Sequence, residues 1–225
     1  MCKKEIPISV IEVSNDIPIS RGLGSSAALI VAGVLAAAHV LDIDDEEFIL
    51  NTMIELEGHP DNVAAAYLGG FVASYKSDMG YKYVSYPISY KLKFMIAYPP
   101  FEVSTDEARS VLPNMLDYSS VVYDLSRIIN LPKALKEGNL ELLRDVMNDK
   151  IHEPYRISLI QDAQMILSLS KKEGYAACIS GSGSTLLFVG HDYDLLNIIE
   201  KMDLKEKWHL SRCEINLSKV KVLVR

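Results

Sequence analysis

The chain has 225 residues, of which 23 are Lys or Arg and 30 are Asp or Glu, so its formal net charge is −7. This charge argues against a protein that binds nucleic acid through a general phosphate field, because such binding needs a basic surface. Hydrophobic residues make up 49% of the chain and charged residues 24%, which excludes disorder as the dominant state. The length allows one large domain or two smaller ones.

The three cysteines, Cys2, Cys178 and Cys213, lack the spacing of a zinc site or a disulfide framework. A reducing compartment is therefore expected. The longest apolar run, residues 27–38, is shorter than the roughly 20 residues that a membrane-spanning helix needs. No apolar signal-peptide core follows Met1. These features predict a cytoplasmic protein with no membrane and no nucleic-acid partner.

The N-terminal part is predicted to contain a strand, two helices and then a group of short antiparallel strands. Alternating apolar residues favour a strand over residues 6–14. The Ala-rich stretch 25–41 predicts a helix buried on nearly all sides, and Asp44 with Glu47 resembles the capping box of a second helix. The short strands are predicted at residues 68–75, 81–87 and 92–97.

The C-terminal part is predicted to be mainly helical before it forms a small sheet. A helical region covers residues 105–172, with breaks at two prolines and a glycine, and a further helix covers 193–202. Short strands are predicted at residues 176–179, 185–189 and 220–224. This order of elements predicts an α+β fold with two domains, residues 1–98 and 99–225.

The segment 21–27, Arg-Gly-Leu-Gly-Ser-Ser-Ala, comes directly before and into the predicted buried helix. Its two glycines let the backbone approach a ligand, and the helix N-terminus offers unpaired N–H groups and the positive end of the helix dipole. These features favour a phosphate-binding loop. A Walker A loop is excluded, because no lysine follows the glycines in the required place. A glycine turn with a serine N-cap is the simplest structural alternative.

A dinucleotide-binding fingerprint is another alternative for this segment. The spacing G-x-G-x-x-A is formally allowed, and Asp42 stands about 20 residues after Gly22. However, Pro18 interrupts the strand that should precede the loop. The chain between the helix and Asp42 is also too short to hold a second parallel strand.

Together with its flanks, the segment resembles the phosphate-binding motif of the GHMP kinase superfamily. The resemblance implies the GHMP kinase fold, with a ribosomal protein S5 domain 2-like N-terminal part, truncated in this chain, and a ferredoxin-like C-terminal α/β sandwich. It also implies that the loop binds the phosphates of ATP. The implied ATP-binding residues are Pro18, Ile19, Ser20, Arg21, Gly22, Leu23, Gly24, Ser25, Ser26, Ala27 and Ala28.

Residues 55–64, Glu-Leu-Glu-Gly-His-Pro-Asp-Asn-Val-Ala, resemble a motif of the homoserine kinases within that superfamily. By themselves, the carboxylates, the histidine and the amide of this segment could form a metal or acid–base site, or simply a polar helix end with caps. The resemblance implies that Glu57 is catalytic and holds Mg²⁺ together with Ser26. Ser25 could replace Ser26 as the metal ligand.

The same motif implies two substrate contacts, His59 and Asn62. Asn62 is also a catalytic candidate, because it stands near the place where some GHMP relatives use a catalytic aspartate. The neighbouring Asp61 is a weak candidate for a base. A strong base is not required, since positioning and electrostatics can supply most of the acceleration of phosphoryl transfer.

Segments 103–109 and 152–156 also resemble homoserine kinases, although each could be an ordinary capped or proline-broken helix with solvated arginines. The resemblance implies that Thr105 lies near the reacting hydroxyl and is catalytic together with Arg109. It further implies that Arg109 and Arg156 clamp the substrate carboxylate. Two guanidinium groups suit this task because each presents paired donors in a fixed fork.

The stretch 179–185, Ile-Ser-Gly-Ser-Gly-Ser-Thr, could be only a hairpin turn. It resembles the third GHMP motif, a glycine-rich loop that leans on the nucleotide loop and the substrate. The family's first motif, by contrast, has no counterpart in the sequence. The chain is therefore expected to lack an N-terminal part of the family and to be weakly active or inactive alone.

Taken together, the resemblances imply a transferase that uses ATP and Mg²⁺ to phosphorylate the side-chain hydroxyl of L-homoserine. The product would be O-phospho-L-homoserine, an intermediate of threonine biosynthesis. L-Homoserine is the expected small-molecule partner, and a homodimer is possible. Two alternatives stay open, namely another GHMP small-molecule kinase, and a truncated inactive member that binds nucleotide without turnover.

Overall fold

The structure, a computed structural model, describes residues 10–78 and 80–223. Contacts divide the chain into two compact units. Unit 1 comprises Met1–Ile19, Gly24–Tyr86 and Asn216–Arg225, and unit 2 comprises Ser20–Leu23 and Pro87–Ile215. The tetrapeptide Ser20–Leu23 thus belongs to unit 2, although the residues on both sides of it belong to unit 1.

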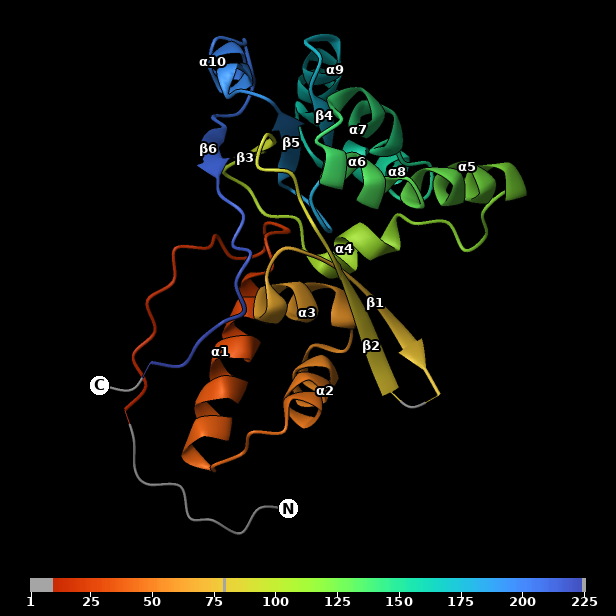
Figure 1. The fold of residues 1–225 in the computed structure, drawn as a ribbon. Helices are drawn as coiled ribbons and strands as arrows, with labels where there is room; N and C mark the ends of the chain where they lie inside the picture. The colour runs from red at the N-terminus through yellow and green to blue at the C-terminus, as the bar shows by residue number, and fades with distance from the viewer. Residues whose placement is uncertain (1–9, 79, 224–225) are drawn as a thin grey trace. The chain divides into compact units, whose positions relative to one another are not determined.

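Unit 1 combines three helices with one antiparallel strand pair (Figure 1). The strands pair along their whole length, from Phe71 opposite Tyr86 to Ser77 opposite Gly80. The elements are α1 (Ser25–Val40), α2 (Glu46–Glu57), α3 (Pro60–Leu68), β1 (Phe71–Ser77) and β2 (Gly80–Tyr86). This confirms the two predicted helices and the antiparallel pairing of two predicted strands, and it adds α3, which was not predicted as a separate helix. The strand predicted at 92–97 does not join this pair, because residues Lys93–Tyr98 pair with strands of the other sheet.

Helix α1 is buried on one side, where it packs against α2 and α3 around Ala27, Val31 and Met53. The prediction that it is buried on nearly all sides is wrong for the described residues. Leu29 and Val40 are 44% and 45% exposed. An Ala-rich helix carries no polar stripe that marks its outer side, so composition alone overstates its burial.

Helix α2 begins one residue later than the predicted capping box. The side chain of Asp45, and not of Asp44, accepts a hydrogen bond from the Phe48 N–H at 3.0 Å. Asp45 has the extended backbone that an N-cap requires. Two neighbouring aspartates offer the same chemistry, so the sequence could not decide between them.

Unit 2 is built around a four-stranded sheet of order β4-β5-β3-β6, in which every neighbouring pair is antiparallel. Helices and a 3-10 turn fill the long connections. The strands are β3 (Lys93–Tyr98), β4 (Ala176–Ile179), β5 (Leu186–Gly190) and β6 (His209–Cys213). The helices are α4 (Thr105–Ser110), α5 (Tyr118–Ile128), α6 (Leu131–Glu137), α7 (Leu140–Val146), α8 (Glu153–Arg156), η1 (Ile157–Leu159), α9 (Ala163–Lys172) and α10 (Asp194–Glu200).

The terminal strands predicted from alternation are corrected by the structure. Of the strand predicted at 6–14, residues 6–9 lie outside the described chain, and residues 10–14 form no strand. Residues 220–223 form no strand either, and residue 224 is outside the described chain. Val220 instead donates one backbone hydrogen bond to Tyr67, at 2.9 Å. Alternation predicts which face of a strand is apolar but supplies no partner strand.

Strand β6 was missed for the opposite reason. Its residues His209, Ser211 and Arg212 are polar and exposed, because β6 is an edge strand that pairs with β3 alone. Such a strand lacks the apolar run of a central one.

In the chain as described, no helix combines the length and the apolar character needed to cross a membrane.

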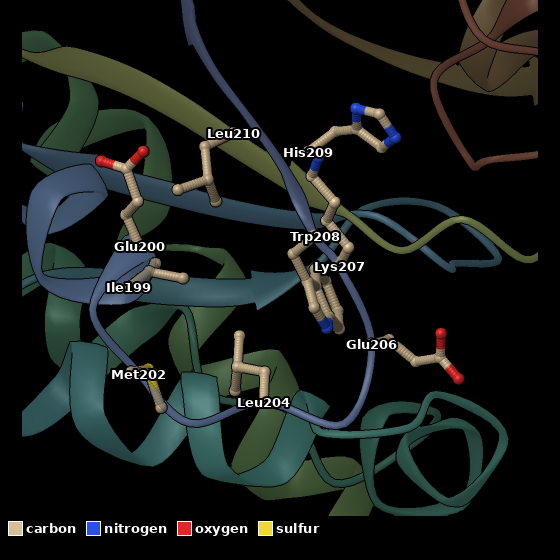
Figure 2. A pocket seen from close by; sticks show the side chains of 9 residues that line it. All are labelled: Ile199, Glu200, Met202, Leu204, Glu206, Lys207, Trp208, His209 and Leu210. Carbon is tan, nitrogen blue, oxygen red and sulfur yellow. The ribbon is translucent and has the colours of Figure 1, made fainter.

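The core of unit 2 lies between the sheet and its helices, with Phe188 and Ile166 fully buried. Trp208, the single tryptophan of the chain, is 8% exposed and belongs to the same cluster. Figure 2 shows its indole ring beside Leu204, at a surface pocket of about 430 Å³. None of the predicted site residues lines this pocket.

We predict that Phe188→Ala destabilises unit 2 by about 3–5 kcal/mol, because it removes a fully buried aromatic ring and leaves a cavity. Urea unfolding followed by Trp208 fluorescence measures the change. Tyr118→Ala is the control, since Tyr118 is 84% exposed and its loss should cost less than about 0.5 kcal/mol. Equal unfolding midpoints for the two variants would contradict the assigned core.

Candidate active site

Within the predicted phosphate loop, Gly24 is the N-cap of α1 and has a left-handed backbone with φ of +71°. In the described structure no side chain caps this helix, and its first turn carries no acidic residue. The serine N-cap considered from the sequence is therefore not formed. An uncapped helix start keeps its N–H groups and its positive dipole end available to an anion.

The two serines of the loop have different environments. Ser25 is buried, and its hydroxyl accepts a hydrogen bond from the Asn15 side chain at 3.3 Å. The Ser26 hydroxyl donates to Glu57 Oε2 at 2.9 Å. Of the two serines, Ser26 is therefore the one in contact with Glu57, the implied metal ligand. A hydroxyl and a carboxylate together suit Mg²⁺, which prefers oxygen ligands.

The motif around His59 forms the tight connection between α2 and α3. Gly58 ends α2 with a left-handed φ of +88°, and Pro60 occupies the first turn of α3. This is the usual placement of glycine after a helix and of proline at a helix start. His59 Nδ1 lies 2.5 Å from Asp61 Oδ1, while Asn62 is exposed. The imidazole is thus oriented by the carboxylate that was the weak base candidate.

The tetrapeptide Ser20–Leu23 lies against the glycine-rich loop of unit 2. The Ser180 hydroxyl donates to the Gly22 carbonyl at 2.8 Å, and the Thr185 N–H donates to the Arg21 carbonyl at 3.2 Å. A Cβ on Gly22 would lie 2.2 Å from the Ser180 carbonyl oxygen. The contact between the two loops, expected from the resemblance, is therefore a backbone-to-backbone contact that requires glycine.

Arg156 lies near Arg109 in unit 2. Its Nε donates to the Ala108 carbonyl at 3.2 Å and its Nη1 to the Gly181 carbonyl at 3.0 Å. Arg109 is the next residue along α4 and is exposed. Thr105 is also exposed, in the first turn of the same helix, which is capped by Ser104. The structure thus brings together the two arginines that the sequence predicted as a carboxylate clamp.

Burial is the main cause that lowers the pKa of the Arg156 guanidinium, and the positive charge of Arg109 lowers it further, while Asp149 opposes both. The positive charge of Arg109 therefore acts on the Arg156 guanidinium. Burial also lowers the pKa of His152. His152 is therefore neutral at pH 7 and adds no third positive charge beside Arg156.

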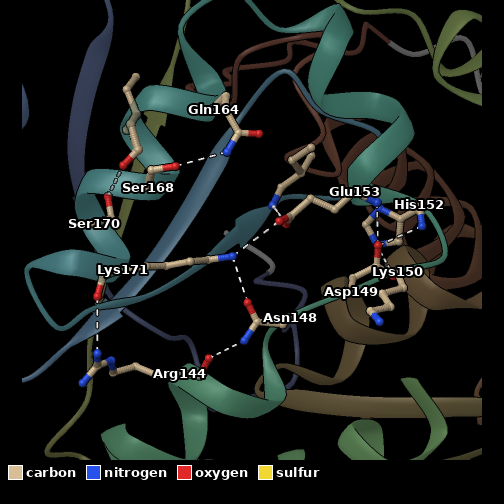
Figure 3. Close-up of polar contacts among 12 residues, drawn as sticks. Arg144, Asn148, Asp149, Lys150, His152, Glu153, Gln164, Ser168, Ser170 and Lys171 are labelled. Carbon is tan, nitrogen blue, oxygen red and sulfur yellow. Dashed lines mark hydrogen bonds and ion pairs between the residues drawn. The ribbon is translucent and has the colours of Figure 1, made fainter. Parts of the chain in front are cut away.

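Helix α8, which carries Arg156, is fixed by two carboxylates, those of Asp149 and Glu153 (Figure 3). Asp149 accepts hydrogen bonds from the backbone N–H groups of His152 and Glu153. The buried Glu153 carboxylate accepts from the Ile179 N–H at 3.1 Å and lies 3.6 Å from Lys171 Nζ. The sequence analysis did not identify Asp149 or Glu153 as relevant to the site, because their role is to hold a backbone.

The predicted site residues therefore form two described groups, one in each unit. In unit 1, Ser26 contacts Glu57 directly, and His59 and Asn62 follow in the next turn. In unit 2, Thr105 and Arg109 share α4, and Arg156 bonds to the Ala108 carbonyl of that helix. The guanidinium of Arg21 contacts backbone carbonyls of residues 99–101.

Two family models match the chain. The model described as GHMP kinases N terminal domain matches residues 2–70, and that described as GHMP kinases C terminal matches residues 132–207. Residues 71–131 lie between the two matches, and unit 2 resumes at Pro87 within this interval. The domain boundary predicted between residues 98 and 99 stays a prediction.

The chain is also similar to curated relatives and to a solved structure that carry the name homoserine kinase. The chain is 41% identical over 209 residues to the homoserine kinase of Clostridium acetobutylicum, covering 88% of this chain and 69% of the relative. It is 35% identical over 207 residues to that of Caldicellulosiruptor bescii, covering 88% and 67%. The crystal structure of a homoserine kinase from Cytophaga hutchinsonii matches with a TM-score of 0.81 and 28% identity, covering 91% of this chain and 69% of that one.

We predict that Gly22→Ala destabilises the protein more than Gly24→Ala. Both glycines are left-handed, with φ of +70° and +71°, so each alanine costs about 1–2 kcal/mol in backbone strain. A Cβ at position 24 meets nothing within 4 Å, whereas one at position 22 collides with the Ser180 carbonyl. Urea unfolding of the two variants measures the difference, and equal destabilisation would contradict the close contact of the loops.

Proposed function

The chain belongs to the GHMP kinase family, and from this premise we propose that it transfers the γ-phosphoryl group of ATP to the side-chain hydroxyl of L-homoserine. The product is O-phospho-L-homoserine, which serves threonine biosynthesis. The observation that carries the proposal is the pair Arg109 and Arg156, because two adjacent guanidinium groups suit the carboxylate of an amino-acid substrate. The homoserine kinase relatives support the same substrate.

The start of α1 and the Ser26–Glu57 pair fit the phosphates of ATP and a Mg²⁺ ion. The uncapped helix start offers backbone N–H groups to phosphate oxygens. Ser26 and Glu57 would hold the cation, their oxygens being 2.9 Å apart. When bound, Mg²⁺ supplies charge neutralisation on the transferring phosphoryl group.

The remaining residues act by binding and orientation. Arg109 and Arg156 hold the homoserine carboxylate, and His59 and Asn62 contact the rest of the amino acid. Thr105, together with Asn62, positions the reacting hydroxyl. Because the transition state of phosphoryl transfer is loose and its charge is spread over several oxygens, alignment and electrostatics account for most of the acceleration, and no strong base is required.

The two alternative functions are less well supported. Another small-molecule kinase of the superfamily would not need the motifs around Glu57, Arg109 and Arg156 to occur together in one chain. An inactive nucleotide-binding member would have no use for two arginines suited to a substrate carboxylate. A panel of homoserine, mevalonate and buffer alone, with ADP release as the readout, separates the three candidate functions. Of these additions, only homoserine is expected to give turnover.

We also propose a cytoplasmic location and a homodimer, and light scattering tests for the homodimer.

We predict that Glu57→Gln lowers kcat/KM by at least about 100-fold at saturating Mg²⁺, because the amide keeps the shape of the side chain but loses the charge that attracts the cation. Activity as a function of Mg²⁺ concentration measures the effect. Glu55→Gln is the matched control, since Glu55 is exposed on the same helix and has no assigned role. A Mg²⁺ response in Glu57→Gln equal to that of the control would contradict the assignment.

We predict that Arg156→Ala and Arg109→Ala each raise the KM for homoserine by about 10- to 100-fold, the equivalent of one charge-assisted hydrogen bond or more. The kcat should change less, because the carboxylate is bound alike in the ground and transition states. Steady-state kinetics with homoserine varied at saturating ATP measure both constants. Arg144→Ala is the control, since Arg144 is an exposed arginine of α7. An unchanged KM in both variants would rule out the clamp.

A further inference from the structure

Arg21 is the one cationic side chain of the predicted phosphate loop, residues 18–28, so a direct contact with phosphate is its obvious role. The structure gives its guanidinium other partners. Nη1 donates to the Pro99 carbonyl at 2.6 Å and also to the Phe101 carbonyl, and Nη2 donates to the Pro100 carbonyl at 2.8 Å. Three consecutive backbone carbonyls thus occupy the side chain.

The carbonyls of residues 99–101 need a hydrogen-bond donor because they lie just beyond the end of a strand. Strand β3 ends at Tyr98, so residues 99–101 lie beyond the hydrogen-bonded ladder of the sheet. Polar backbone groups that leave a ladder must be satisfied elsewhere, in particular at Pro99, which is buried. A planar guanidinium with five donors in a fixed fork can serve several carbonyls at once, which a lysine cannot do.

The backbone of residues 21 and 22 is held by the glycine-rich loop, residues 179–185. The Arg21 carbonyl accepts from the Thr185 N–H at 3.2 Å, and the Gly22 carbonyl accepts from the Ser180 hydroxyl at 2.8 Å. The segment after β3 therefore binds the side chain of Arg21, and the glycine-rich loop binds the backbone of Arg21 and Gly22. Two residues later the chain reaches Gly24, from which the phosphate-binding helix starts.

We propose that Arg21 is a positioning residue that latches the phosphate loop to the end of β3 and to the glycine-rich loop of unit 2, and that it does not bind phosphate. The inference rests on the proposed function for its kinetic consequences. The latch fixes the backbone of residues 21 and 22, which lie shortly before the N-cap Gly24 of α1 in the chain.

The latch also reaches the amino-acid side of the proposed reaction. The Gly181 carbonyl, which accepts from Arg156 Nη1 at 3.0 Å, belongs to the loop that grips Gly22. A Cβ on Gly181 would lie 3.2 Å from the Gly22 carbonyl oxygen, so the two backbones are in close contact. Loss of Arg21 should therefore affect the binding of homoserine as well as of ATP. A simple phosphate ligand would affect ATP alone.

The kinetic test compares Arg21→Lys and Arg21→Ala with the wild-type enzyme, and Arg144→Lys is the matched control on the surface of unit 2. For both Arg21 variants we expect a KM for ATP raised by about tenfold or more. The KM for homoserine should rise by about two- to fivefold, because Gly181 shifts with the loop. Arg21→Lys keeps the charge, so near wild-type behaviour in that variant would overturn the proposal. A rise confined to the KM for ATP would overturn it as well.

A second measurement does not depend on activity. In the nucleotide-free protein, amide hydrogen exchange at Thr185 and Gly183 should be at least about tenfold faster in both Arg21 variants than in wild type, because the Thr185 N–H loses a fixed acceptor. Unchanged exchange would overturn the latch. If the wild-type chain does not phosphorylate homoserine, the proposed function fails, and the exchange experiment still decides the role of Arg21. Circular dichroism establishes that Arg21→Lys, the milder variant, is folded.

Discussion

The close approach of Gly22 to the Ser180–Gly183 backbone is the constraint on which the arrangement of the candidate site depends. Two main chains can lie this near only if neither carries a side chain at the point of contact, and the Cβ of any other residue would overlap the Ser180 carbonyl. The contact assigns the tetrapeptide Ser20–Leu23 to unit 2, while the helix that it leads into belongs to unit 1. The predicted phosphate loop is therefore shaped in part by its contact with the Ser180–Gly183 loop.

A second constraint is the need for positive potential in a chain of net charge −7. Arg156 contributes positive potential because its hydrogen-bond partners, the carbonyls of Ala108 and Gly181, are neutral. Among the described residues, no carboxylate lies within ion-pair distance of its guanidinium. A guanidinium oriented by carbonyls keeps its charge for a ligand, whereas one paired with a carboxylate would have it largely neutralised. The first turn of α1 contains no acidic residue, and the one carboxylate described at this helix start is that of Glu57, which accepts a hydrogen bond from Ser26.

The sequence predicted the parts of this arrangement that depend on local chemistry. The glycine turn before α1 and the capped start of α4 follow from residue type, and the structure contains both. The sequence could not predict contacts between residues that lie far apart in the chain. The carbonyls that occupy Arg21 lie 78 to 80 residues further along the chain, and the exposure of Leu29 depends on which elements cover α1. Apolar alternation likewise predicted strands at both ends of the chain, but pairing decides whether a strand forms.

The segment that presents Arg156 is held in a way that depends on pH, and the direction follows from its two titratable supports. Burial opposes ionisation of Asp149, but the N–H groups of Glu153 and His152 outweigh it and hold the pKa of this carboxyl below its ordinary value. Burial lowers the pKa of His152. In both cases the folded pKa lies below the unfolded one, so each group contributes stability above its unfolded pKa and loses that contribution as the pH falls through the folded value. Acid therefore acts twice on α8, since it removes the anion that accepts its first N–H groups and adds a positive charge beside Arg156. The proposed carboxylate clamp is therefore best supported at neutral pH, where the carboxylate of an amino acid also carries its negative charge.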